Sequence, residues 1–297
     1  MSVRSLVLVA GVAALLIAAA LWVYPSSTDF AGANPYWHGT RWSRAELRIA
    51  GLRAPADLPA EPKGTVLIVI PAVPPRMDHL DRLARYVAAG GVLVVLDDFG
   101  QGNRILARLG STARFHGKRL ADPLFNYRNP RLPRITELAP AATAAGVREI
   151  VFNHATALDG IAGMTVLARS SPVSYLDLNG NGRRDGDDPG GPFPVAAVTP
   201  VGLGTLVVVG DPSLLLNSML DLGQNRRFLQ YLFQFAGSAA QVYLDEASLP
   251  RAPLDRAKVG LAQARALIAH PLLAYALAAV AFALPLVILL KSWGGRS

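Results

Sequence analysis

The residues DLNGNGRRDGDD, at positions 177–188, have the spacing of a calcium-binding loop. An EF-hand-type loop places oxygen ligands at its positions 1, 3, 5, 7, 9 and 12 and a glycine at position 6. Calcium prefers oxygen ligands, so the pattern predicts one structural Ca²⁺ ion. The corresponding ligands are Asp177, Asn179, Asn181, the carbonyl of Arg183, Asp185 and Asp188, with Gly182 at the turn.

A plain polar connection between two strands is the alternative interpretation of this loop. Position 12 is Asp188, which is shorter than the usual bidentate glutamate, and no pair of helices is expected beside the loop. Asn, Gly and Asp also dominate ordinary turns. If an ion binds, only a few carboxylates supply negative charge, so the weak binding that is typical of extracellular modules is expected.

A second set of carboxylates follows apolar segments that are typical of buried strands. Asp97 and Asp98 come directly after VLVVL, and Asp211 follows TLVVVG. Ligands of open α/β sheets bind at the carboxyl ends of the strands, so these side chains are candidates for a site. Turn formation and helix capping are the alternative roles for such residues.

The remaining reactive residue types form no catalytic pattern. The sequence has no cysteine, which excludes disulfides, thiolate metal sites and thiol nucleophiles. The histidines lack metal-ligand spacing, and His79 is expected to be solvated on the polar side of a helix. Asp245 and Glu246 are adjacent carboxylates but are expected to form a solvated strand end. The sequence therefore predicts no catalytic residues and no enzyme.

The elements that must position these residues alternate between strands and helices. Residues 65–70 and 92–96 are continuous apolar runs, typical of strands that are buried on both faces. Residues 77–89 between them have apolar residues at helical spacing and end at Gly90-Gly91. The alternation predicts an α/β fold with a doubly wound, flavodoxin-like sheet that is partly mixed. Further strands are expected at 149–152, 164–168, 193–198, 205–209 and 241–244, and helices at 225–235 and 252–269.

Two uncharged runs of twenty residues, 5–24 and 271–290, lie near the ends of the chain. A helix of that length spans the hydrocarbon core of a bilayer, so two transmembrane helices are expected to flank the domain. A cleaved signal peptide is the alternative for the first run. Arg4 precedes that run and no Lys or Arg follows it until Arg41, which favours cytoplasmic ends and a domain outside the cytoplasm.

The charge of the chain indicates its expected partners, and the order of its segments indicates its expected organisation. The formal net charge is +8, without any dense block of basic residues, so no nucleic-acid partner is expected. A basic, membrane-tethered domain instead predicts attraction to the lipid bilayer. The expected segments are an N-terminal anchor (1–24), a stalk (25–64) with one short element around residues 45–52, an extracytoplasmic α/β domain (65–250), a membrane-proximal helix (251–270), a transmembrane helix (271–290) and a cytoplasmic tail (291–297).

The order of the sequence motifs resembles a group of uncharacterised, membrane-anchored prokaryotic proteins. The motifs are YVAAGG, VLVVLDDFGQGN, SYLDLNGNGRRDGDDPGGPFPVAAV, VVVGDPSLLLN, NRRFLQYLF and VYLDE. The group is a domain of unknown function with a class-I-glutamine-amidotransferase-like fold, related to GldG-type ABC-transporter auxiliary proteins. The resemblance covers residues 65–247 and implies an amidotransferase-like sheet with a binding or scaffolding role. Those amidotransferases use a cysteine, so the absence of cysteine excludes glutaminase chemistry.

The expected function is that of a membrane-anchored, extracytoplasmic binding or scaffolding domain with a structural calcium loop. It is expected to be accessory to an ABC-type transporter or an envelope complex, in the cell membrane. The expected partners are the lipid bilayer and a membrane protein such as an ABC transporter subunit. The alternative is a novel or degenerate hydrolase that uses Asp97, Asp98 and Asp211.

Overall fold

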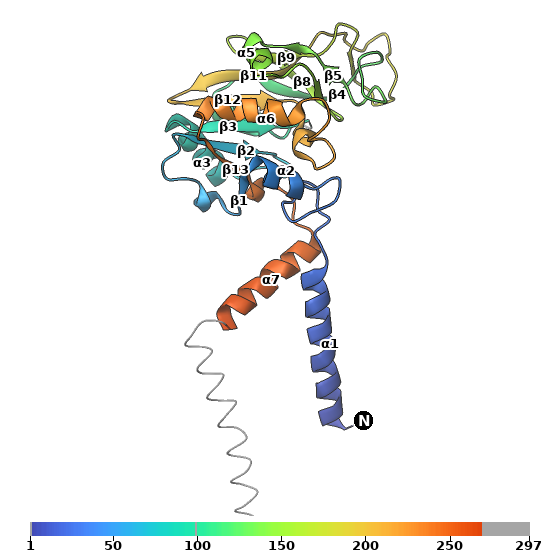
Figure 1. The fold of residues 1–297 in the computed structure, drawn as a ribbon, viewed down its shortest axis with the longest axis vertical. Coiled ribbons are helices and arrows are strands. Elements are labelled where there is room, and N and C mark those ends of the chain that lie inside the picture. Colours follow the sequence, from blue (N-terminus) through green and yellow to red (C-terminus); the bar gives the residue numbers. More distant parts are fainter. Residues whose placement is uncertain (1, 99, 269–297) are drawn as a thin grey trace, which may run out of the picture. The chain divides into compact units, whose positions relative to one another are not determined.

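A computed structural model describes residues 2–98 and 100–268 of the protein. These residues form two compact units (Figure 1). Residues 2–26 and 251–268 make up the first unit, and residues 27–250 make up the second. The second unit contains the described strands and all the candidate site residues.

The first unit consists of two helices and the short segments next to them. Helix α1 spans Val3–Val23 and helix α7 spans Pro253–Ile268. Within this unit, Ser26 Oγ donates a hydrogen bond to Asp255 over 3.0 Å. The guanidinium of Arg265 also lies 5.9 Å from the centre of the Trp22 ring.

The prediction that two transmembrane helices flank the domain is wrong. Among the described residues, no helix is both long enough and apolar enough to cross a membrane. Helix α7 carries four charged residues between Asp255 and Arg265, and charged side chains raise the cost of burying a helix in hydrocarbon. The second predicted span, residues 271–290, lies outside the described residues.

An eight-stranded sheet runs through the second unit (Figure 1). Strands β2 (Thr65–Val69) and β3 (Val92–Leu96) are buried along their whole length, as their continuous apolar sequences require. Neighbouring strands are parallel from β1 to β12 and antiparallel from β12 to β6, so the sheet is mixed. The order is β1 (Ile49–Leu52), β13 (Gln241–Asp245), β2, β3, β12 (Gly204–Val209), β11 (Pro194–Val201), β9 (Thr165–Arg169) and β6 (Glu137–Leu138).

A strand–helix–strand unit connects the two buried strands, as the sequence predicts. Helix α3 (Met77–Ala88) joins β2 to β3, which pair in parallel. Its apolar residues, including Leu80 and Leu83, are buried against one face of the sheet. The chain leaves the helix through Gly90, whose φ of 107° is accessible at low cost only to glycine.

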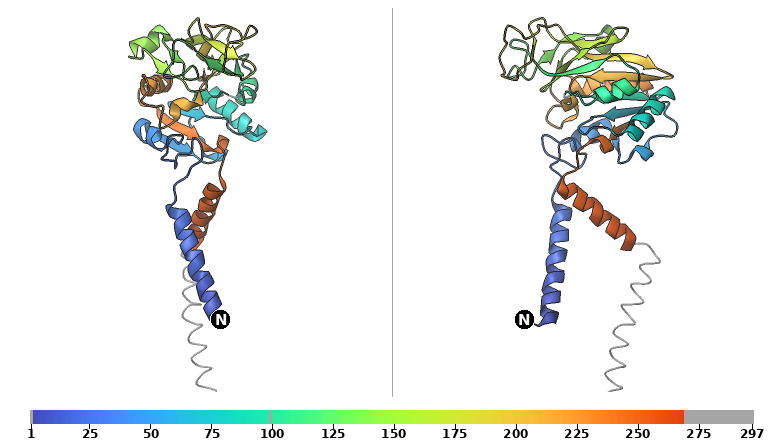
Figure 2. Two further views of the ribbon diagram at one scale, coloured as in Figure 1. Left: turned by 90° about the vertical axis from the view of Figure 1, so that its right-hand side faces the viewer. Right: turned by 180° about the vertical axis from the view of Figure 1, so that it is seen from behind.

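Helices cover both faces of the large sheet (Figure 2). Helices α3 and α4 (Asn103–Arg108) pack with Leu67 of β2 in one apolar core. Helix α6 (Asn225–Phe233) packs with Val66 in a second core. Successive residues of a strand point to opposite faces, so the fully apolar sequence of β2 supplies side chains to both cores.

Two smaller sheets complete the second unit. Strands β10 (Tyr175–Asp177), β4 (Arg114–Ala121) and β8 (Thr156–Asp159) are antiparallel, and β5 (Arg134–Ile135) pairs with β7 (Ile150–Val151). Strand β4 has the sequence RFHGKRLA, and the sequence analysis does not predict it because it has no apolar run. The short helices are α5 (Pro140–Ala144) and the 3-10 helices η1 (Pro55–Asp57), η2 (Pro212–Leu215), η3 (Gln234–Ala236) and η4 (Glu246–Ser248).

Residues 25–64 differ from the stalk that their composition predicts. Helix α2 (Arg41–Leu47) and strand β1 lie within this segment, and Leu47 and Ile49 are part of the core of the second unit. Strand β1 pairs in parallel with β13, which comes from the other end of the unit. Strand pairing uses backbone groups that every residue except proline provides in full, so a composition rich in Pro, Ala and Gly does not reveal it.

Candidate functional site

Three buried carboxylates lie at the carboxyl ends of two neighbouring parallel strands. Asp97 and Asp98 follow β3, and Asp211 follows β12, with Leu96 and Val209 paired just before them. Their exposed fractions are 3%, 8% and 0%, respectively. The parallel pairing of β3 and β12 therefore brings all three to the edge of the sheet at which α/β proteins bind ligands.

Two of these carboxylates accept hydrogen bonds from the backbone of nearby turns. Asp97 Oδ2 accepts from the Gly102 N–H over 2.5 Å, which closes the turn that precedes α4. Asp211 accepts from the N–H groups of Asn153 over 2.6 Å and of Ser213 over 2.7 Å, so it caps η2. These bonds correspond to the capping role that is the alternative interpretation of such residues.

Asp98 differs from the other two carboxylates. Within the described part of the chain, its buried Oδ1 has no hydrogen-bond partner. Burial, and then the charges of Asp211 and Asp97, raise the pKa of Asp98 from 3.8 to about 8. Burial likewise raises the pKa of Asp211 to about 7. Both carboxyl groups therefore exchange a proton near neutral pH, which is the property that general acid–base chemistry requires.

A distant segment of the chain joins this edge at Asn153, whose N–H binds Asp211. The next residue, His154, has a φ of 58° and a pKa that is lowered by burial and then by the charges of Arg119 and Arg131. Its imidazole is therefore held in the neutral form. No sequence spacing connects residues 153–154 with Asp211, so only the fold reveals that the two segments meet.

The predicted calcium loop is closed by hydrogen bonds of its own. Asp177 accepts two backbone N–H groups, from Gly180 over 2.8 Å and from Gly182 over 2.9 Å. Asp188 accepts two more, from Leu178 over 3.0 Å and from Asp185 over 2.8 Å. Both carboxylates therefore organise the turns of the loop, which is the role expected of Asp in a polar connection.

The remaining predicted ligands meet on the exposed side of the loop. Asn179 and Asn181 both donate from Nδ2 to Asp185 Oδ2, each over 2.7 Å. Their Oδ1 atoms accept backbone N–H groups, and Asn181 Oδ1 accepts the one of Arg183 over 2.8 Å. The side-chain oxygens that a calcium ion needs are thus engaged with hydrogen-bond donors.

As arranged, this loop does not fit a metal ion. In the part of the chain that the structure describes, no three acidic, histidine or cysteine side chains are grouped as a metal site requires. Calcium binding would need the amides of Asn179 and Asn181 to turn their oxygens, together with Asp185, towards a common centre. Calcium therefore stays a prediction for measurement in solution.

A buried histidine links helix α3 to the end of β13. His79 is 5% exposed, and its Nε2 lies 2.8 Å from Asp245 Oδ2. Ser248 Oγ donates to the same oxygen over 2.5 Å. The expectation that His79 is solvated is wrong, because the carboxylate at the end of β13 reaches the first turn of α3.

These three residues do not have the geometry of a nucleophilic triad. A triad needs the serine to donate to one ring nitrogen and the aspartate to hold the other. Here Asp245 contacts both partners through one oxygen, and Ser248 Oγ lies 3.5 Å from the same His79 Nε2. The neighbouring Glu246 pairs with Arg44 over 2.5 Å. Asp245 and Glu246 thus contact different partners, and they do not form a pair of carboxylates.

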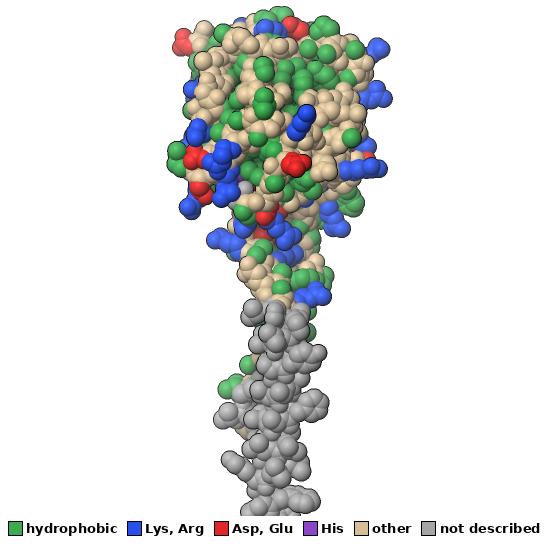
Figure 3. Space-filling view, turned by 90° about the vertical axis from the view of Figure 1, so that its left-hand side faces the viewer, with side chains coloured by type: hydrophobic (Ala, Val, Ile, Leu, Met, Phe, Trp, Pro, Cys, Tyr) green, Lys and Arg blue, Asp and Glu red, His purple; other side chains and the backbone are tan. Residues whose placement is uncertain are grey.

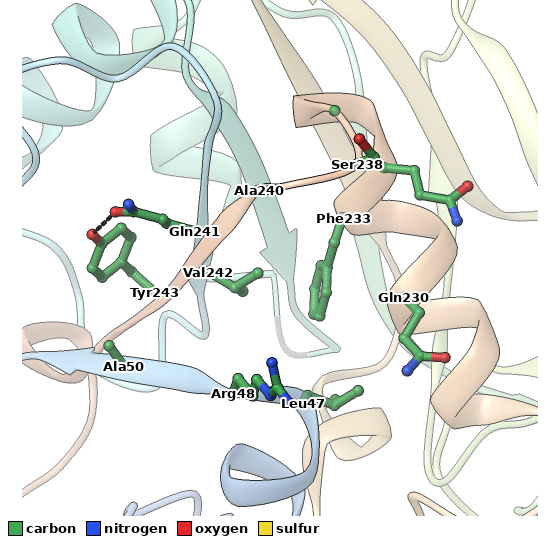
Figure 4. A pocket seen from close by; sticks show the side chains of 12 residues that line it. Leu47, Arg48, Ala50, Gln230, Phe233, Ser238, Ala240, Gln241, Val242 and Tyr243 are labelled. Atoms are coloured by element: carbon green, nitrogen blue, oxygen red, sulfur yellow. Dashed lines mark hydrogen bonds between the residues drawn. The ribbon is translucent and has the colours of Figure 1, made fainter.

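A hollow of about 660 Å³ lies between helix α6 and the edge formed by β1 and β13 (Figure 4). Leu47, Phe233 and Val242 supply apolar side chains to it, and Arg48 and Gln230 supply polar ones. None of the twelve lining residues carries a carboxylate or an imidazole. The other lining residues are Ala50, Gln234, Gly237, Ser238, Ala240, Gln241 and Tyr243.

The sequence analysis does not predict this hollow. Its lining comes from residues 47–50, which the composition assigns to a stalk, and from residues 230–243. The two segments meet only because β1 pairs with β13. No motif connects the two segments, and neither segment carries a sequence signal for the hollow.

Residues 38–233 match the protein family described as "Domain of unknown function (DUF4350)". The match covers more than half of the chain and includes the three carboxylates and the predicted calcium loop. The chain matches no curated protein.

Several solved structures are similar to part of the chain at low TM-scores. The "mmIFT52 N-terminal domain" has a TM-score of 0.45 and 14% identity, over 58% of this chain and 76% of that one. Gan42B, a GH42 β-galactosidase from G. stearothermophilus, has a TM-score of 0.36 and 17% identity, over 57% of this chain and 21% of its own. The β-galactosidase from Rahnella sp. R3 has a TM-score of 0.37 and 14% identity, over 63% and 23%. At these values the similarities carry no conclusion about activity.

Proposed function

The chain belongs to the DUF4350 family, and from that starting point we propose that it is a non-enzymatic binding domain that docks a partner in the hollow beside β1 and β13. The lining of the hollow is the observation that supports this proposal. Binding sites are concave, mostly apolar, and hold a few polar groups in volumes of roughly 300–1,000 Å³. The volume of the hollow lies in this range, its lining combines apolar side chains with Arg, Gln and Ser, and it lacks the carboxylate or imidazole that acid–base catalysis would need.

Arg48 gives the hollow a charge preference. No ion pair within the described residues includes Arg48, and it is exposed where it lines the hollow. Its φ of 54° lies in the left-handed region, in which Arg48 ends helix α2 as its C-cap and turns the chain into β1. The occupant that fits is a short apolar segment of a protein that carries an acidic side chain or a carboxyl terminus.

The position of β1 suits such a segment. It is the last strand on its side of the large sheet, so one edge of its backbone has no neighbouring strand among the described residues. Extended peptides bind sheets by adding to an edge of this kind, with main-chain hydrogen bonds for affinity and side-chain pockets for specificity. The hollow would then receive one side chain of the added segment.

The proposed partner is a membrane protein, with an ABC-type transporter subunit as the first candidate. The motif order over residues 65–247, which resembles that of GldG-type auxiliary proteins, supports this choice. The binding or scaffolding role implied by that resemblance agrees with a docking hollow that has no catalytic group.

Site-specific photo-crosslinking in native membranes tests the proposal. A photoreactive amino acid is introduced at Arg48 or Gln230, which both line the hollow and are exposed. The matched control carries it at Leu203, which is 85% exposed in the turn between β11 and β12. We expect the same adduct from Arg48 and Gln230, identified by mass spectrometry as a transporter subunit, and no such adduct from Leu203.

Two results would contradict the proposal. Crosslinks from Leu203 that equal those from the hollow would show unspecific contact. Absence of any adduct from both hollow positions, in membranes that contain the whole native protein complement, would show that the hollow is not a docking site.

A hydrolase that uses Asp98 and Asp211 is the second candidate, because the raised pKa values of these two carboxyl groups favour acid–base work. Its test is hydrolysis of a panel of ester, phosphate and glycoside substrates by the wild type and by Asp98→Asn. Turnover by the wild type that falls at least about a hundredfold in the variant would favour the hydrolase. Turnover by neither protein would leave the binding proposal as the better account.

A further inference from the structure

Three large aromatic side chains are exposed together in the loop before helix α2 and at its start. Trp37 is 68% exposed, Trp42 is 56% exposed and Tyr36 is 43% exposed. Exposed apolar groups that cluster, unlike scattered ones, mark interaction surfaces. We call Tyr36, Trp37 and Trp42 the aromatic platform.

The backbone of the aromatic platform is held in place by one side chain from a distant segment. Asn217 Oδ1 accepts the N–H of Trp42 over 2.9 Å, and its Nδ2 donates to the carbonyl of Tyr36 over 2.6 Å. The N–H of Ser218 donates to the carbonyl of Trp37 over 3.1 Å. The three rings are therefore presented by a fixed backbone, which lowers the entropy that docking costs.

Contacts between the rings leave much of their surface exposed. The His38 ring lies between those of Tyr36 and Trp37, with centroids 6.2 and 4.8 Å away. Trp42 Nε1 donates to the carbonyl of Pro35 over 3.0 Å. The polar atom of Trp42 is thus satisfied within the loop, while its apolar ring surface stays available to a partner.

The surroundings of the platform are basic. The Arg41 guanidinium lies 5.5 Å from the centre of the Trp42 ring, and no ion pair of the described residues includes Arg41. The acidic residues of positions 29–48 are Asp29, whose carboxylate lies 3.9 Å from His38 Nε2, and Glu46, which is paired with Arg226 over 2.8 Å. The three arginines of the same positions, Arg41, Arg44 and Arg48, outnumber them. The whole chain has a net charge of +8, and Figure 3 shows Lys and Arg side chains spread over the face of the second unit that lies on the left in Figure 1.

From these observations we infer that the aromatic platform docks the domain on an anionic lipid surface. Trp and Tyr favour the boundary between lipid head groups and hydrocarbon, because each has an apolar body and a polar tip. Arginine beside them is attracted to the negative surface potential of anionic lipids. The hollow beside β1 and β13 does not include the platform, and the exposed rings of the platform suit a broad surface.

Fluorescence of the two platform tryptophans tests this inference on the full chain. Trp22→Phe and Trp293→Phe leave Trp37 and Trp42 as the only tryptophans. The protein is mixed with vesicles of phosphatidylcholine alone or of phosphatidylcholine with phosphatidylglycerol, each with and without brominated lipid. We expect a blue shift and quenching by brominated lipid that are strong only with phosphatidylglycerol. Arg41→Gln should lower the docked-to-undocked ratio about fivefold, since one arginine contributes about 1 kcal/mol at an anionic surface.

The matched control keeps the platform and places the probe elsewhere. Leu203→Cys, labelled with an environment-sensitive thiol fluorophore in a chain that has no other cysteine, reports on an exposed position in the turn between β11 and β12. Circular dichroism confirms that each variant is folded. Equal quenching at position 203 and at the platform would show unspecific adsorption and overturn the inference. Platform tryptophans that stay unquenched on both vesicles would overturn it too, and so would a blue shift caused by a membrane protein but not by lipid alone.

Discussion

Replacement of Asp98 by asparagine should make the protein more stable at alkaline pH. The carboxyl group of Asp98 is buried, and its pKa of about 8 lies far above its ordinary 3.8. Between these two pH values the folded state binds more protons than the unfolded state, so stability falls as the pH rises. Above pH 8 the carboxyl group of Asp98 is ionised in both states, and the stability linked to its protonation is completely lost. Asparagine cannot ionise, so the variant avoids this loss.

The size of the effect follows from the pKa difference. Each unit of pKa corresponds to about 1.4 kcal/mol, so the pKa values of Asp98 set an upper limit of about 6 kcal/mol. Water entry and side-chain rearrangement offset part of the cost of a buried charge, and we expect a gain of about 2–3 kcal/mol near pH 9. Near pH 4 the folded wild type is protonated at Asp98, so the difference between wild type and variant should be close to zero.

Urea denaturation of the wild type and Asp98→Asn across this pH range measures the effect. Asp211 keeps its own raised pKa of about 7 in the variant. The variant should therefore still lose stability as the pH rises to 7, and it should lose little more at higher pH. The control is Asp159→Asn at the exposed end of β8, which should change stability by less than about 0.5 kcal/mol at any pH. A constant destabilisation of Asp98→Asn at all pH values would refute the reasoning, because it would show that the native state needs the carboxylate.

Substitutions at three other positions test single contacts of the structure and the predicted calcium site. Asn225→Ala removes three buried hydrogen bonds, two of them to the backbone of Val151, and should cost about 3 kcal/mol in urea denaturation. His79→Ala leaves the buried carboxylate of Asp245 without its imidazole partner and should cost about 3 kcal/mol, whereas His79→Gln, which keeps a donor, should cost clearly less. Calcium at ten times its Kd should stabilise the wild type by about 1.4 kcal/mol, and Asp185→Ala should lose this gain in scanning calorimetry; no gain in the wild type would remove calcium from the account.

The sequence predicts the helices and strands that are determined by the residues within them. The continuous apolar runs of β2 and β3 and the helical spacing in α3 are local signals, and the structure contains all three elements. Strand β1 depends on its pairing with β13, and β4 depends on its pairing with β8 and β10. Backbone pairing of this kind stabilises short or mostly polar sequences that give little local signal. Such pairing partners lie far away in the sequence, and no local window contains them.

Some features of the candidate sites could likewise be predicted from local sequence, and others depend on the whole fold. The positions of Asp98 and Asp211 after buried strands could be predicted from their local sequences, but their meeting depends on the pairing of β3 with the distant β12. The unpartnered oxygen of Asp98 and its raised pKa depend on burial by the surrounding chain, which no local pattern shows. The loop at 177–188 has the spacing of a calcium loop, but hydrogen bonds from Asn179 and Asn181 to Asp185 give those side chains another use. The spacing of the residues alone cannot distinguish a calcium-binding loop from a loop that is closed by its own hydrogen bonds.

Titration calorimetry with the partner recovered by crosslinking tests the central claim, that the hollow beside β1 and β13 is a docking site. Binding of the purified partner to the full chain is compared with its binding to Arg48→Glu, which reverses the charge beside the hollow, and to Leu203→Glu. The account predicts saturable binding that weakens at least about tenfold in Arg48→Glu, because a repulsive charge at an interface costs more than 1.4 kcal/mol, and that is unchanged in Leu203→Glu. Equal affinity of the wild type and Arg48→Glu would contradict it.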